Sequence, residues 1–128
     1  MHPKSTEYRL ATSDDMVDIY EHFDITERIG WPVVVAVRED KVVGFLGTQD
    51  RTDTVAAGPL EINLENKAFV CLRLVEGYDR VMRSMGLKHY WFSVDETDAE
   101  KWLQQVQELG LYTKIDQTGD HAWYRRDL

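Results

Sequence analysis

The chain has 128 residues, a length suited to one domain with a single hydrophobic core. Its 43% apolar content is typical of a folded protein, and its formal net charge of −8 opposes binding to nucleic acid or to an anionic membrane. One cysteine, Cys71, excludes an internal disulfide. The N-terminus lacks the apolar run of a signal peptide, and no stretch approaches the roughly 20 apolar residues of a membrane span. We therefore expect one soluble, cytoplasmic domain over residues 1–128.

The N-terminal region predicts a strand followed by a helix. Tyr8–Ala11 is expected to form a short strand, and Asp14–His22 a helix, because apolar residues recur there at helical spacing. Thr12 and the acidic residues after it supply N-cap chemistry. Asp24–Gly30 is predicted to form a second short turn or helix, which Trp31-Pro32 closes.

Two strands and a tight turn follow. Val33–Arg38 and Lys41–Gln49 are rich in β-branched residues and predict a hairpin around Glu39-Asp40. Val55–Leu64 predicts a longer strand. Because the proline of Gly58-Pro59 cannot donate a hydrogen bond, we expect a bulge or an edge at that point.

The stretch ENKAFVCLRLVEGYDRVMRSMG predicts a long helix that ends at Gly86. One face carries an apolar stripe and the opposite face carries arginines. The stripe comprises Cys71, Val75, Tyr78, Met82 and Met85, and the arginines are Arg73, Arg80 and Arg83.

The C-terminal region predicts a strand, a helix and a closing hairpin. His89–Val94 is almost wholly apolar or aromatic, as in a central strand buried on both faces. A capping box at Thr97–Glu100 begins a helix that Gly110 ends. Leu111–Asp116 and His121–Arg126 form the hairpin, and Arg125 and Arg126 are interpreted as solvated.

The predicted order is β, α, β, β, β, α, β, α, β, β. The strand–helix–strand crossover makes Val55–Leu64 and His89–Val94 parallel, whereas the hairpins make the remaining pairs antiparallel. We therefore predict an α/β fold with a mixed, mostly antiparallel sheet of six to seven strands, a central parallel pair and helices on both faces.

This order resembles the GNAT superfamily of acyl-CoA N-acyltransferases. Three stretches carry the resemblance: PVVVAVREDKVVGFLG, VEGYDRVMRSMGLKHYWFSV and DAEKWLQQVQELGLY. The resemblance implies a GNAT-like fold, acetyl-CoA or another acyl-CoA as cofactor, and transfer of the acyl group to an amine substrate.

In that family a strand-to-helix turn holds the pyrophosphate of the cofactor, with the motif Gln or Arg, two residues, Gly, one residue, Gly or Ala. Counting back from Gly86 places the motif on Asn66–Cys71, where Phe69 and Cys71 occupy the glycine positions. The cofactor-binding residues that the resemblance implies are Ile62, Asn63, Leu64, Asn66, Lys67, Phe69, Val70 and Cys71.

The family's catalytic groups map onto this chain incompletely. Glu61, on the strand before the turn, is the candidate base, with an ordinary solvated carboxylate as the alternative. The family's tyrosine acid falls on Val106, which cannot donate a proton, and Tyr112 is either a substitute or a packing residue. His89 is either a second candidate or a polar strand end, and Cys71 either a nucleophile or a small core residue. The four histidines are far apart in sequence, so we expect no metal site.

A second hypothesis remains open. Small proteins of short-tailed bacteriophages, some associated with virions, are similar to this chain in size and pattern and have an equally glycine-poor turn. This similarity implies a divergent, phage-like GNAT-fold module that is non-catalytic, binds a protein partner, and is found in the host cytoplasm or the virion.

Overall fold

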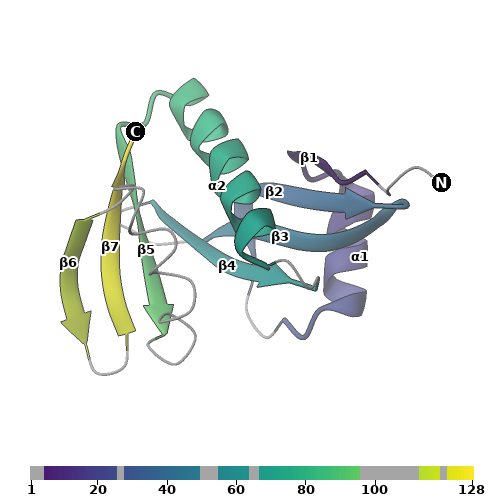
Figure 1. Cartoon of the computed structure of the whole chain (residues 1–128), viewed down its shortest axis with the longest axis horizontal. Helices are drawn as coiled ribbons and strands as arrows, with labels where there is room; N and C mark the ends of the chain where they lie inside the picture. The colour runs from purple at the N-terminus through teal and green to yellow at the C-terminus, as the bar shows by residue number, and fades with distance from the viewer. Residues whose placement is uncertain (1–4, 26–27, 50–54, 64–66, 96–112, 119–120) are drawn as a thin grey trace.

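The computed structural model describes residues 5–25, 28–49, 55–63, 67–95, 113–118 and 121–128. These form a seven-stranded sheet in the order β1-β2-β3-β4-β5-β7-β6, with helices on both faces (Figure 1). β4 and β5 are parallel and the other neighbours antiparallel, so the predicted fold class is confirmed. The elements are β1 (Glu7–Leu10), α1 (Ser13–His22), β2 (Gly30–Arg38), β3 (Lys41–Gln49), β4 (Ala56–Ile62), α2 (Lys67–Ser84), β5 (His89–Asp95), β6 (Thr113–Thr118) and β7 (His121–Asp127). The helix predicted between Thr97 and Gly110 lies outside the described residues.

The N-terminus of α1 is closed by a capping box. The Asp15 N–H donates to the Thr12 hydroxyl at 3.2 Å, and the Thr12 N–H donates to the Asp15 carboxylate at 2.7 Å. Arg9 from β1 donates to both oxygens of the same carboxylate. Burial raises the pKa of Asp15, but the hydrogen bonds from Arg9 and Thr12 outweigh it, so the pKa lies below its ordinary value.

The segment after α1 folds back onto that helix. The Ile29 N–H donates to the Tyr20 hydroxyl at 3.1 Å, and β2 already begins at Gly30. The second helix predicted in this segment does not form in its described residues, since Ile25 and Ile29 pack into the core beneath α1.

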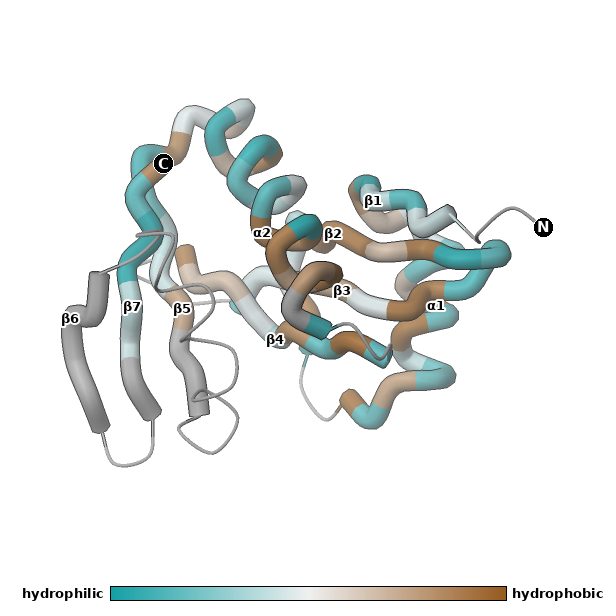
Figure 2. Tube along the Cα trace, viewed as in Figure 1, coloured by the Kyte–Doolittle hydropathy of each residue, from teal (hydrophilic) through white to brown (hydrophobic). Residues whose placement is uncertain are grey.

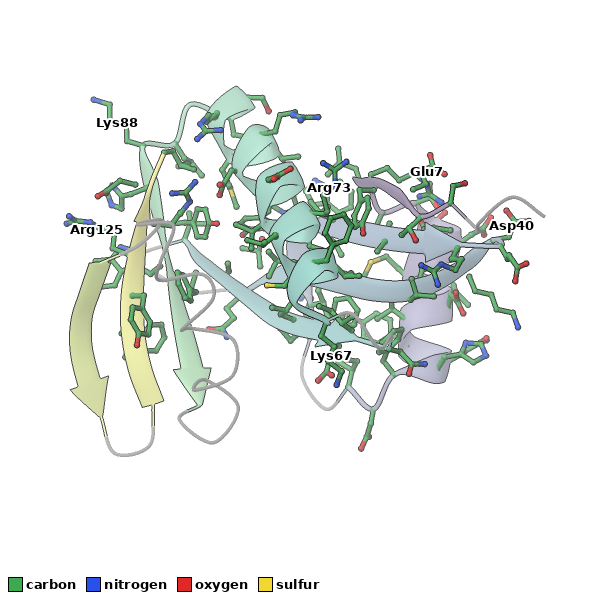
Figure 3. The ribbon with its side chains drawn as sticks, viewed as in Figure 1. Glu7, Asp40, Lys67, Arg73, Lys88 and Arg125 are labelled. Atoms are coloured by element: carbon green, nitrogen blue, oxygen red, sulfur yellow. The ribbon has the colours of Figure 1, made fainter. Side chains whose placement is uncertain are left out.

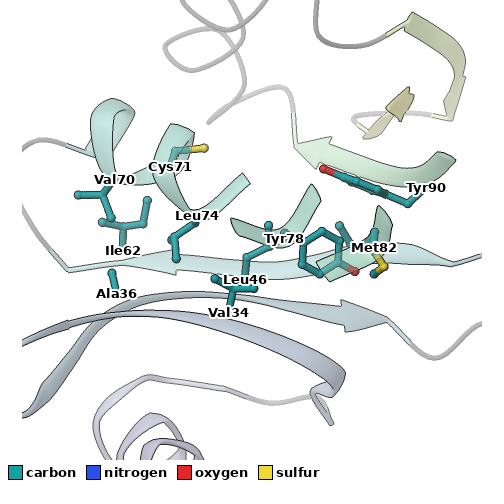
Figure 4. Close-up of a cluster of buried hydrophobic side chains, with 11 residues drawn as sticks. Val34, Ala36, Leu46, Ile62, Val70, Cys71, Leu74, Tyr78, Met82 and Tyr90 are labelled. Atoms are coloured by element: carbon teal, nitrogen blue, oxygen red, sulfur yellow. The ribbon is translucent and has the colours of Figure 1, made fainter. Parts of the chain in front are cut away.

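Successive residues of β2 are buried on opposite faces of the sheet. Val33 and Val35 pack with α1 and Phe45, whereas Val34 and Ala36 pack beneath α2. Both β2 and the N-terminal part of α2 are largely apolar in Figure 2. The sheet therefore has a core on each face, and Figure 4 shows the one beneath α2.

The predicted bulge lies in β4 at Gly58-Pro59. Leu46 pairs with Leu60 and Thr48 pairs with Ala57, so a step of two residues in β3 faces a step of three in β4. Gly58 has a φ of +137°, and a Cβ there would lie 2.9 Å from the Gln49 side-chain nitrogen.

Helix α2 packs on the sheet through its predicted apolar stripe and ends at the predicted glycine. Gly86 has a φ of +82°, its N–H donates to the Arg83 carbonyl, and the Leu87 N–H donates to the Met82 carbonyl. Met85 is exposed, because it follows the last helical residue and lies in this terminal turn.

The C-terminal strands follow the prediction with shifted bounds. In β5, Tyr90 is buried but Trp91 and Phe92 are half-buried, so burial on both faces is incomplete. β6 and β7 form the predicted closing hairpin, with β6 described from Thr113 onwards.

Asp15→Asn is expected to lower the free energy of unfolding at neutral pH by about 1–2 kcal/mol, because it removes a partnered carboxylate. The native pKa of Asp15 lies below its unfolded value, so this contribution exists above the unfolded pKa and disappears as the pH falls through the native pKa. Urea unfolding of both proteins across acidic pH measures it. A difference that stays constant down to the lowest pH would contradict the assignment.

Gly58→Ala is expected to cost more stability than Gly86→Ala. Both positions have a positive φ, which costs a side chain about 1–3 kcal/mol, but the alanine Cβ at Gly58 also displaces Gln49, whereas Gly86 faces open space. Urea unfolding compares the two variants. Equal losses would show that the bulge tolerates a side chain.

Candidate functional site

Strands β4 and β5 pair over a short distance and then diverge. The register pairs Ala56 with Trp91 and Ala57 with Phe92, and the Trp91 N–H donates to the Val55 carbonyl at 2.9 Å. Beyond the bulge β4 runs to the N-terminus of α2, whereas β5 continues beside β7 (Figure 1). The divergence therefore begins at Gly58-Pro59.

The end of β4 presents backbone groups toward this divergence. The Asn63 N–H donates to the Val43 carbonyl at 2.7 Å, so the backbone groups of Asn63 and Glu61 point toward β3. Because backbone direction alternates along a strand, the N–H and C=O groups of Leu60 and Ile62 point the opposite way. They lie on the side from which β5 has diverged.

Side chains at this end of β4 divide between the two faces. Ile62 is buried in the core beneath α2, whereas Glu61 is exposed. Glu61 pairs with Phe45, which belongs to the core beneath α1, so the Glu61 carboxylate lies on the α1 face. Asn63, the next residue, is also exposed.

The N-terminus of α2 follows β4 closely and favours an anion. Its first turn contains no acidic residue and begins with the exposed Lys67, at the end of the helix nearest β4 (Figure 3). The first N–H groups of a helix have no partner within the helix and carry the positive end of its dipole. This end can therefore hold a phosphate or another anion.

The next residues of α2 divide between solvent and core. Phe69 is 55% exposed, whereas Val70 and Cys71 are buried against the sheet (Figure 4). Burial raises the pKa of Cys71 to about 12, so the thiol stays protonated and packs as a small core residue.

Of the remaining sequence candidates, only His89 lies within the described residues. Leu64, Asn66, Val106 and Tyr112 lie outside the described residues. His89 is exposed at the start of β5, and within the described ranges no three potential ligands cluster around a metal position. In the same ranges no helix is both long and apolar enough to cross a membrane.

Sequence reasoning missed a buried polar cluster that joins α2, β5 and β7. Asp79 of α2 is 2% exposed, accepts a hydrogen bond from the Tyr90 hydroxyl at 2.6 Å, and pairs with Arg126 at 2.8 Å. Arg126 is thus not a solvated tail residue as predicted, since its side chain is 15% exposed. The available signal was the position of Asp79 beside Tyr78, on the edge of the apolar stripe.

The tyrosines beside Asp79 remain protonated. Burial raises the pKa of Tyr78 to about 12. Burial, followed by the negative charge of Asp79, raises the pKa of Tyr90 well above its ordinary value. Both hydroxyls therefore keep their protons, and the Tyr90 hydroxyl donates its proton to Asp79.

Comparisons with known proteins place this geometry in a fold group. No protein-family model matches the chain, and a search of curated proteins found no match either. Among solved structures, Ard1 from Thermoplasma volcanium aligns with a TM-score of 0.72 and 15% identity, covering 96% of this chain and 97% of its own. A GNAT-family acetyltransferase from Staphylococcus aureus Mu50 aligns at 0.69 and 9%, covering 97% and 99%.

A third similar structure contains coenzyme A. The PaiA N-acetyltransferase from Thermoplasma acidophilum, in complex with coenzyme A, aligns with a TM-score of 0.63 and 11% identity, covering 90% of this chain and 68% of its own. At these identities the likeness establishes architecture, and the chain has the fold of the GNAT acetyltransferases.

Proposed function

We propose that the chain binds an acyl-CoA where β4 and β5 diverge and transfers the acyl group to an amine. One observation carries the proposal: beyond its divergence from β5 at Gly58-Pro59, β4 leads to a helix that begins with Lys67 and has no acidic residue in its first turn. The coenzyme A bound to a protein of the same fold supports it.

Two features of the described residues support binding of coenzyme A. The pyrophosphate would lie at the N-terminus of α2, where Lys67 and the first N–H groups supply positive charge. The amides of the pantetheine would hydrogen-bond to the backbone of β4 around Ile62. Asn63, Leu64 and Asn66 remain cofactor-binding candidates from the sequence alone.

The two residues in the family's glycine positions affect this fit differently. The Cys71 side chain is buried in the core together with Val70, so it does not extend toward an anion at the helix end. Phe69 is exposed in the first turn of α2, at the end of the helix that would receive the pyrophosphate. We expect a weaker cofactor complex than a glycine at this position would allow.

Glu61 is the proposed base. An amine acceptor must lose a proton before its lone pair can attack the thioester carbonyl, and an exposed carboxylate on β4 can accept that proton. The new C–N bond forms as the C–S bond breaks, coenzyme A leaves as the thiolate, and solvent protonates it. The acid at this step is therefore water.

The competing function is a non-catalytic module that binds a protein partner. Phe69 favours it, because an exposed aromatic side chain in the first turn of α2 suits a protein contact as well as it hinders a phosphate. A measurement of acyl-CoA binding distinguishes the two functions.

Acetyl-CoA is expected to raise the melting temperature of the protein. At about 100 times its dissociation constant, a ligand adds about 2.7 kcal/mol to the folded state. Lys67→Gln is expected to weaken binding about tenfold, which corresponds to about 1.4 kcal/mol, whereas Lys88→Gln, beyond the other end of α2 (Figure 3), is expected to leave it unchanged. Titration calorimetry measures both constants. If millimolar acetyl-CoA gave no stabilisation, the acyl-CoA proposal would be wrong and the protein-binding function would remain.

Glu61→Gln is expected to lower turnover by about 100-fold or more, because the base is lost while the backbone of β4 is retained. Acetyl-CoA affinity should stay within twofold. Glu76→Gln, on the exposed face of α2, is the matched control and should turn over normally. Steady-state kinetics with a panel of amines measures the effect, and unchanged turnover of Glu61→Gln would remove this residue from the mechanism.

A further inference from the structure

The Asp79 carboxylate joins three elements at one buried point. Tyr90 of β5 donates to one oxygen at 2.6 Å, and Arg126 of β7 donates to the other through Nη2 at 2.8 Å and Nε at 3.1 Å. The carboxylate belongs to α2 and is 2% exposed. Helix α2 is therefore tied directly to both strands by hydrogen bonds that charge strengthens.

A second set of contacts extends this cluster across the sheet. The Tyr90 ring packs edge-to-face on Tyr78 with centroids 5.0 Å apart (Figure 4), and the Tyr78 hydroxyl lies 2.7 Å from that of Thr48. The Thr48 hydroxyl donates to the Pro32 carbonyl at 2.9 Å. The contacts thus run from β7 through α2 to β3 and β2.

These contacts cross the junction between β4 and β5, where only a short stretch of backbone is paired. Within the described residues β4 and β5 pair at Ala56–Trp91 and Ala57–Phe92, whereas β5 pairs with β7 along its full length. Thr48 pairs with Ala57, directly before the bulge. The cluster therefore bridges the two halves of the sheet beside these register pairs, just before β4 and β5 separate.

We propose that Asp79, Tyr90 and Arg126 are positioning residues that hold β5 and β7 at a fixed distance from the end of β4, and so set the width available to an acyl-CoA. The inference rests on the proposed function for its ligand. The geometry of the cluster supports a positioning role over general stabilisation, since a buried ion pair adds little net stability compared with apolar side chains but fixes direction strongly.

The test replaces the ion pair by apolar residues of similar size. Asp79→Leu combined with Arg126→Met retains packing, so its free energy of unfolding should stay near that of the wild type. Its dissociation constant for acetyl-CoA, measured by calorimetry, should rise at least tenfold. The matched control is Arg73→Met with Glu76→Gln, an exposed ion pair on the same helix, whose constant should stay within twofold.

Hydrogen exchange supplies a readout that needs no ligand. The Trp91 amide, which donates to Val55 across the junction, should exchange at least tenfold faster in the Asp79→Leu, Arg126→Met variant. The Ala11 amide, which donates to Val33 on the far side of the sheet, should be unchanged. Tyr90→Phe removes one hydroxyl and should give the same pattern with a smaller change, so it serves if the double variant does not fold.

The outcomes separate this inference from the proposed function. Wild-type affinity with unchanged exchange at Trp91 would overturn the positioning role, as would faster exchange at Trp91 and Ala11 together, which indicates general destabilisation. Absence of acetyl-CoA binding by the wild type would overturn the proposed function, while selective exchange at Trp91 would still support the junction held by Asp79.

Discussion

The parallel pairing of β4 with β5 is short, and the bulge at Gly58-Pro59 ends it. The extra residue turns β4 at this point, and no register pair with β5 follows it among the described residues. The helix that follows β4 then begins beside the gap in pairing, with Lys67 at its first position. This two-residue bulge is therefore followed by backbone donors, a helix N-terminus and a lysine at the C-terminal end of β4.

The local positive charge at this end of β4 contrasts with the negative net charge of the chain. The formal net charge of −8 disfavours anions at long range, but the helix dipole and Lys67 act within a few ångströms, where salt and distance reduce them least. The Glu61 carboxylate lies on the opposite face from the buried Ile62, so the proposed base and the helix core do not compete for the same space. The groups proposed for binding and for proton transfer are therefore separated by the alternation of side chains along one strand.

Buried side chains link the two halves of the sheet where the backbone pairing between β4 and β5 is short. Interstrand hydrogen bonds hold each half of the sheet along its length, whereas the junction has two register pairs supported by the contacts of Asp79, Tyr90 and Tyr78. A buried carboxylate costs desolvation free energy unless it is fully partnered, and Asp79 has partners at both oxygens. Its presence in a helix otherwise packed through apolar residues is explained by what it connects.

The sequence by itself determined the elements whose signals are local: the hairpin of β-branched residues, the N-cap at Thr12, the glycine end of α2 and the bulge at Gly58-Pro59. It also located the strand–turn–helix unit of the candidate site, because that unit is contiguous in the chain. Only the tertiary structure decided that Arg126 pairs with Asp79, residues 47 positions apart, and that Phe69 is exposed. Side-chain pairing between distant elements depends on sheet order and helix rotation, which periodicity does not specify.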